Sequence, residues 1–117
     1  MGVHNSASVD PVIPMPEKTP AALRIAVARL APEAVAKFDS HWASAMEQAR
    51  QEYSLLPGRQ FVEHWWTWVA VTRHPERAAR LRECERVIAD SDDRSLRRSA
   101  AEEIARILAA STAEAGA

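Results

Sequence analysis

The sequence is poor in glycine, cysteine and long apolar runs, and each shortage excludes a class of protein. Gly58 is the only glycine between residues 3 and 115, so no glycine-rich loop is available to bind the phosphates of a nucleotide. The single cysteine, Cys84, cannot form an intramolecular disulfide, which favours a reducing compartment and predicts a cytoplasmic protein. No run approaches the ~20 apolar residues that span a bilayer, and the N-terminus lacks the features of a secretion signal. We therefore expect a soluble, unprocessed protein with no membrane association.

An excess of charge of one sign is also missing. The 15 basic and 16 acidic residues give a formal net charge of −1 and are spread through the chain. No strong electrostatic field then attracts the protein to nucleic acid or to an anionic membrane. The charge balance therefore argues against a broad phosphate-binding surface.

Strand patterns are absent, because β-branched residues never alternate with polar residues over the length of a strand. Ala, Arg, Glu and Leu dominate from residue 19 onward, which is a helical composition. Prolines fit the first turn of a helix but not its interior, so they indicate where helices begin. We expect helices over about 20–30, 32–54, 57–73, 75–89 and 93–111.

These helices predict an all-α fold, a compact bundle of four or five helices around one core, with an extended proline-rich N-terminal tail. The bundle domain is expected over residues 19–112, after a flexible tail at 1–18 and before a flexible C-terminus at 113–117. The long helix over 32–54 carries an apolar seam from Val35 to Tyr53 with a spacing near 3.5 residues, which is typical of a coiled-coil face. Such a face is consistent with a homodimer.

The proline-rich segment differs in kind from the rest. Residues 9–16 read Val-Asp-Pro-Val-Ile-Pro-Met-Pro, and repeated X-Pro steps favour extended backbone. Two interpretations stay open. The segment is either a disordered or loosely docked tail, or a short recognition segment that lies in a groove of a partner or of a second copy.

Residues suited to catalysis or metal binding do not form a pattern. The histidines are isolated in the sequence, and a zinc site needs several of them with cysteines at short, regular spacing. Cys84 lies in an apolar stripe, where a thiol packs as a small hydrophobe. We therefore expect no catalytic residue, metal site or cofactor, and no enzyme. The enzyme alternative requires a cleft between two subunits that gathers His41, His64 and Glu63.

Trp66 is the first candidate for binding a partner. Trp65 and Trp68 share one helical face, which we expect to be core, whereas Trp66 lies at the edge of that face. Arg59 and Arg73 lie seven residues before and after Trp66. Trp and Arg together are typical of binding hot spots. The alternative is that both arginines stack on Trp66 and cover the rim of the core.

The arginine-rich helix over 75–89 is the second candidate. Arg82 and Arg86 are four residues apart on one side of the helix, where two like charges are unfavourable unless an opposite charge compensates them. The positive charge of these arginines is compensated either by acidic residues of the chain itself or by an acidic partner or phosphate.

The stretch from Leu23 to Leu108 resembles a family of small all-helical actinobacterial proteins of unknown function. The residues that carry the resemblance are Leu30-Ala31-Pro32-Glu33-Ala34, Phe38, Phe61-Val62-Glu63-His64-Trp65 and Val69-Ala70-Val71-Thr72-Arg73-His74-Pro75. They are mostly core and capping residues, so they imply a fold and no chemistry. The resemblance excludes the proline-rich tail. Some genes of this kind lie beside toxin-like genes, so the resemblance implies at most an antitoxin-like or small regulatory partner.

The sequence thus favours a non-enzymatic protein-protein interaction module of the cytoplasm that binds a protein partner. Its predicted partner-binding residues are Arg59, Trp66, Arg73, Arg82 and Arg86. The alternative is a nucleic-acid-binding regulator that uses the arginine-rich helix, which the near-zero net charge opposes.

Overall fold

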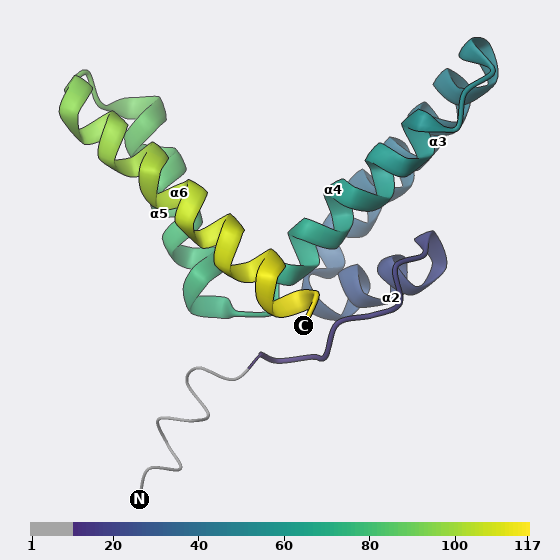
Figure 1. The fold of residues 1–117 in the computed structure, drawn as a ribbon, viewed down its shortest axis with the longest axis horizontal. Helices are drawn as coiled ribbons and strands as arrows, with labels where there is room; N and C mark the ends of the chain where they lie inside the picture. Colours follow the sequence, from purple (N-terminus) through teal and green to yellow (C-terminus); the bar gives the residue numbers. More distant parts are fainter. Residues whose placement is uncertain (1–10) are drawn as a thin grey trace, which may run out of the picture. The chain divides into compact units, whose positions relative to one another are not determined.

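The computed structural model describes residues 11–117, and within this range the chain is all-α (Figure 1). It contains five α-helices and one short 3₁₀ helix, and no strand occurs in the described range. The elements are α2 (Pro20–Leu30), η1 (Pro32–Ala34), α3 (Val35–Glu52), α4 (Leu56–Thr72), α5 (Pro75–Asp90) and α6 (Arg94–Ala115). The predicted fold class and the five predicted helices are confirmed. Part of the predicted tail, residues 1–10, lies outside the described residues.

Local sequence explains where the helices begin. Thr19 caps α2, because its Oγ1 accepts a hydrogen bond from the backbone N–H of Ala22 at 3.2 Å, and Pro20 occupies the first turn. Asp93 caps α6 and accepts from the N–H groups of Ser95 and Leu96. Aspartate is among the residues preferred at this position, because its carboxylate satisfies the free N–H groups of the first turn.

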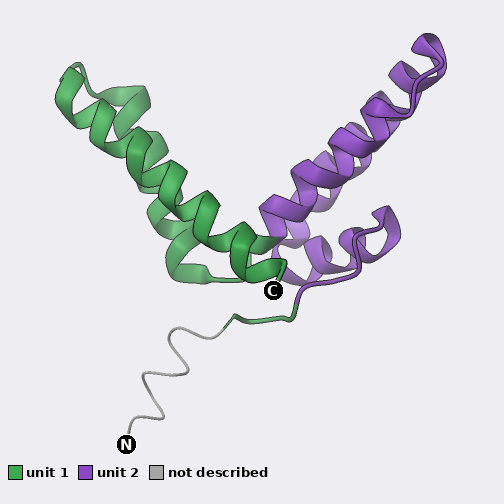
Figure 2. Cartoon of the chain, viewed as in Figure 1, with its two compact units in different colours: residues 1–14, 70–117 green, residues 15–69 purple. Residues whose placement is uncertain are grey.

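The helices divide between two compact units, where the sequence led us to expect one core (Figure 2). Unit 2 comprises residues 15–69 and holds α2, η1, α3 and most of α4. Unit 1 holds residues 70–117, with α5 and α6, together with the segment that ends at Pro14. The buried side chains of the two units differ in size.

Large aromatic rings form the core of unit 2. The Phe38 ring lies 4.9 Å from that of Phe61 and 5.0 Å from that of Trp65, measured between centroids. Such edge and tilted contacts are the preferred geometries of aromatic pairs. Leu23 and Val27 of α2 are fully buried in the same unit. The predicted core position of Trp65 is confirmed, since it is 2% exposed, whereas Trp66 and Trp68 are partly exposed.

Small side chains form the core of unit 1. Ala78 and Cys84 of α5 and Ala100 and Ser111 of α6 are buried, so the two helices lie close together. Ion pairs also link α5 to α6 at the surface of this helix pair. A guanidinium N–H of Arg80 donates to Glu103 at 2.7 Å, and Arg77 donates to Glu114 at 2.8 Å.

The described part of the proline-rich segment contacts the chain itself. In unit 1 the backbone N–H of Val12 donates to the carbonyl of Arg73 at 2.8 Å, and the Arg73 guanidinium lies 3.5 Å from the carbonyl oxygen of Ile13. In unit 2 Lys18 forms an ion pair with Glu63 at 2.7 Å. Of the two interpretations, residues 11–18 thus agree with the docked form of the first.

Candidate interaction surface

The turn between α3 and α4 exposes large apolar side chains. Tyr53 is 97% exposed, Leu55 is 76% exposed and Leu56 is 55% exposed. Tyr53 was predicted to extend the seam of the long helix, and this was wrong: α3 ends at Glu52, and Tyr53 turns the chain with φ 52°. Ser54 then starts α4, because its Oγ accepts a hydrogen bond from the N–H of Leu56 at 3.0 Å. We call Tyr53, Leu55 and Leu56 the hairpin end.

Tyr53 occupies a conformation that disfavours its residue type. Its φ of 52° and ψ of 47° lie in the left-handed region, where helices usually end with glycine. An L-residue costs roughly 1–2 kcal/mol there. A side chain that is 97% exposed gains almost no packing to offset that cost. The conformation lets the backbone N–H groups of Tyr53 and Ser54 donate to the carbonyl of Ala49, which closes the end of α3.

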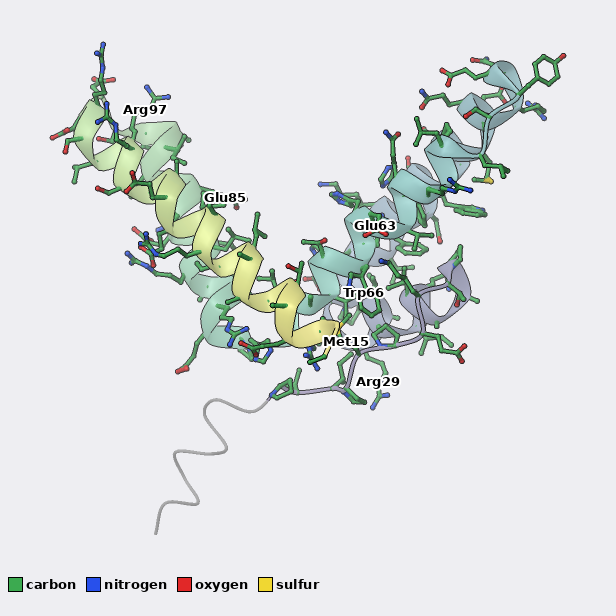
Figure 3. The ribbon with its side chains drawn as sticks, viewed as in Figure 1. Met15, Arg29, Glu63, Trp66, Glu85 and Arg97 are labelled. Atoms are coloured by element: carbon green, nitrogen blue, oxygen red, sulfur yellow. The ribbon has the colours of Figure 1, made fainter. Side chains whose placement is uncertain are left out.

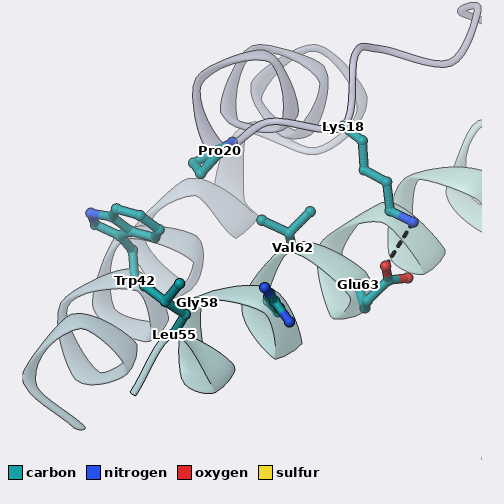
Figure 4. Close-up of a pocket in the computed structure, with 8 residues that line it drawn as sticks. Lys18, Pro20, Trp42, Leu55, Gly58, Val62 and Glu63 are labelled. Atoms are coloured by element: carbon teal, nitrogen blue, oxygen red, sulfur yellow. Dashed lines mark ion pairs between the residues drawn. The ribbon is translucent and has the colours of Figure 1, made fainter. Parts of the chain in front are cut away.

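A pocket of about 520 Å³ adjoins the hairpin end within unit 2 (Figure 4). Its apolar wall includes Trp42 of α3 and Val62 of α4, and Leu55 links it to the hairpin end. The lining residues are Lys18, Pro20, Trp42, Leu55, Gly58, Arg59, Val62 and Glu63. A concave apolar surface with a few polar groups at its edge is typical of a binding site.

Two different cationic groups lie at the edge of this pocket. Lys18 pairs with Glu63, and its ammonium lies 5.2 Å from the ring centroid of Trp66. Glu63 and Trp66 both project from α4 (Figure 3). Arg59 is exposed and forms no ion pair with any described residue. Lys18 is therefore neutralised by an ion pair within the chain, whereas the charge of Arg59 is available to solvent or to a partner.

The predicted residues around Trp66 differ in their exposure and in their contacts. Arg59 lines the pocket, as a binding role requires. Trp66 is partly exposed, but the cation over its ring is Lys18, which the sequence did not single out. Arg73 belongs to unit 1, is 8% exposed and contacts residues 12 and 13, so its side chain is not available at the surface.

Most arginines of α5 form ion pairs with glutamates of unit 1. Besides the pairs of Arg77 and Arg80 described above, Arg86 pairs with Glu83. Arg82 is exposed and has no ion pair among the described residues. Of the two interpretations offered for this helix, the geometry agrees with a face neutralised by its own acidic residues.

A histidine cluster supports the core of unit 2 beside the pocket-forming helices. The Trp65 indole N–H donates to Nδ1 of His41 at 2.9 Å, so His41 carries its own proton on Nε2. The His64 ring lies 5.3 Å from that of His41. Partial burial is the main cause that lowers the pKa of His64, and the positive charge of Lys37 adds to it. These groups hold α3 and α4 together, and we assign them no chemistry.

Groups suited to metal or thiol chemistry are not gathered in the described structure. No set of three His, Cys, Asp or Glu residues within residues 11–117 is placed to bind a metal ion. Cys84 is 2% exposed, and burial raises the pKa of its thiol. Across residues 11–117, no helix combines the length and apolar character needed to cross a membrane.

Sequence reasoning missed the hairpin end, although a signal was present. Three large apolar residues surround Ser54 immediately before Pro57, in and beside a turn, where polar residues are usual. Lys18 was missed because its partners Glu63 and Trp66 lie far away in the sequence.

Comparison with known proteins assigns a family. A family model matches residues 11–112, so the matched region includes the described proline-rich segment, and the expectation that the resemblance excludes this segment was wrong. Comparisons with curated proteins and with solved structures find no significant match. Since the family model covers most of its length, the chain belongs to the family of unknown function DUF6247.

Proposed function

We propose that the protein is a non-enzymatic protein-protein interaction module that binds its partner through the hairpin end and the adjoining pocket of unit 2. The observation that carries the proposal is the hairpin end itself. Tyr53, Leu55 and Leu56 are all more than half exposed and follow one another around a single turn. Exposed apolar side chains gathered in one place are typical of interaction sites.

Two further observations support this surface. Aromatic and arginine side chains contribute most to binding at interfaces, and both types are present here as Tyr53, Trp42 and Arg59. The Tyr53 side chain is 97% exposed, so its aromatic ring is available to a partner.

The alternative, a nucleic-acid-binding regulator, has less support. Residues 70–117 carry equal numbers of basic and acidic side chains, and Arg77, Arg80 and Arg86 each pair with a glutamate. A phosphate would have to displace these carboxylates. We therefore favour a protein partner. We further propose that the protein acts in the cytoplasm, and an antitoxin-like or small regulatory role depends on the identity of that partner.

A matched pair of substitutions tests the proposal. Leu56 in unit 2 and Leu96 in unit 1 are both 55% exposed, so an aspartate at either position removes an apolar side chain of equal exposure. Tagged full-length chains are used to capture protein from the native cell extract at moderate salt, with nuclease treatment in parallel. We expect one stoichiometric partner, which is either a distinct protein or untagged copies of the chain itself. It should be retained by the wild type and by Leu96→Asp and lost by Leu56→Asp.

Equal capture by both variants would overturn the proposal. Capture that disappears after nuclease treatment would instead support the nucleic-acid alternative. Circular dichroism of each variant checks that the helices are intact, which the exposure of both leucines predicts.

A further inference from the structure

We infer that the partner of the hairpin end is a second copy of this chain, and that two hairpin ends meet around a two-fold axis close to Leu55 and Leu56. This inference rests on the proposed function, since it names the occupant of the same surface. It is carried by a complementarity that the chain has with itself, in apolar shape and in charge.

In apolar shape, the exposed hairpin end of one copy matches the pocket of the other copy. The hairpin end projects Tyr53, Leu55 and Leu56 into solvent. The pocket beside it offers about 520 Å³ between Trp42 and Val62. Leu55 belongs to both features, so a copy whose hairpin end enters the pocket of its partner also receives the hairpin end of that partner. A surface that contains both halves satisfies the requirement of an isologous, two-fold interface.

The charged half consists of one cation and one anion that the fold leaves without an ion pair. Arg59 lies at the edge of the pocket, and neither it nor Glu52 at the end of α3 has an oppositely charged partner among residues 11–117. Nearby charges differ in this respect, because Glu47 pairs with Arg50 and Glu63 pairs with Lys18. Glu52 accepts a single hydrogen bond, from Gln48 at 3.0 Å. Both groups thus keep their charge available for another molecule.

The positions of these two charges fit a two-fold axis. Glu52 precedes Leu55 by three residues, and Arg59 follows Leu56 by three residues. We therefore place the axis so that Glu52 of each copy lies near Arg59 of the other. The dimer gains two such ion pairs around an apolar centre, which is the usual arrangement of a polar rim around a hydrophobic interface core.

Two other features of the chain offer less to a partner. Arg73 is 8% exposed and its guanidinium donates to the carbonyl oxygen of Ile13, so its side chain is not accessible to a partner. The exposed Ile25 is a single apolar side chain at 63% exposure, and isolated exposed apolar residues are ordinary on protein surfaces. The hairpin end, in contrast, combines several exposed apolar residues, a pocket and complementary unpaired charges.

A charge-reversal cycle followed by sedimentation analysis tests the inference. The full-length wild type is expected to show a concentration-dependent monomer-dimer equilibrium between about 1 µM and 1 mM, the range of weak to moderate affinities. Arg59→Glu and Glu52→Arg, each alone, should weaken dimerisation about tenfold, because each replaces two attractions per dimer with two repulsions. The double variant should recover most of the wild-type affinity. Leu56→Asp should be monomeric, and the matched control Leu96→Asp should dimerise as the wild type does.

The outcomes separate this inference from the proposed function. A wild type that stays monomeric over the whole range overturns the inference, and so does a dimer that single charge reversals leave unchanged or that the double variant fails to restore. If a different protein is then captured from the extract and lost only in Leu56→Asp, the proposed function stands without the dimer. If Leu56→Asp alters neither self-association nor capture, both are overturned.

Discussion

Replacing Tyr53 with glycine should make the protein more stable while weakening its interactions. Tyr53 has φ 52° and ψ 47°, a left-handed conformation that costs an L-residue roughly 1–2 kcal/mol. Glycine avoids this cost but gains freedom in the unfolded chain, which offsets about 0.4–1 kcal/mol. The side chain is 97% exposed, so its removal should cost almost no packing. The net expectation is a stabilisation of about 0.5–1 kcal/mol.

The assay is thermal unfolding of the full-length protein, followed by circular dichroism. A gain of 1 kcal/mol raises the melting temperature of a domain of this size by about 4–8 °C, so a rise of a few degrees is expected. Tyr53→Ala is the matched control. It removes the same aromatic ring but keeps the Cβ that makes the left-handed region unfavourable, and its melting temperature should stay close to that of the wild type.

Binding should respond differently from stability. Both Tyr53→Gly and Tyr53→Ala remove the ring from the hairpin end, so both should weaken partner capture or self-association by a similar factor. A melting temperature of Tyr53→Gly below that of Tyr53→Ala would refute the reasoning, because it would mean that the left-handed strain is not relieved. A large loss of stability in both would show that the ring packs against the folded chain.

Three further predictions concern the rest of the molecule. Partial burial lowers the pKa of His64, so the unfolded chain binds a proton there more readily than the folded chain. This contribution to stability should be fully present above about pH 6.5 and should be lost as the pH falls below it. His64→Gln should reduce the dependence of urea unfolding on pH in this range, and an unchanged dependence would count against this origin. Arg73→Ala should destabilise the protein by about 1–3 kcal/mol, because the hydrogen bond to a buried carbonyl and the packing of the aliphatic stem are lost. Arg82→Ala, at an exposed position, should change the melting temperature little. Equal effects of the two substitutions would contradict the burial of Arg73. Cys84, buried and with a raised pKa, should react with a thiol reagent only after unfolding, so rapid modification of the native protein would contradict its position.

The helices were predictable from the sequence because proline and capping signals are local. Pro20 and Pro75 each occupy the first turn of a helix, and Asp93 caps the last one. The burial of Trp65 followed from helical periodicity, which fixes the side that a residue faces. The division into two units was not predictable, because periodicity identifies an apolar face without identifying its partner helix.

The candidate surface was only partly predictable for the same reason. Arg59 was identified from its spacing to Trp66 and does line the pocket. Arg73 has the same spacing on the other side, yet it is buried against the proline-rich segment, and no local rule connects residues 12 and 13 with residue 73. The exposure of Tyr53 depends on where α3 ends, and the apolar seam runs on past that point without an interruption that would mark it.

Hydrogen exchange of the full-length chain tests the central claim most directly. Backbone exchange is measured for the free, dilute protein and for the protein bound to its captured partner or concentrated enough to self-associate. We expect slower exchange over residues 53–59, the hairpin end and the start of α4, with no change over residues 94–98 at the start of α6. Unchanged exchange over 53–59 together with slower exchange over 94–98 would contradict it.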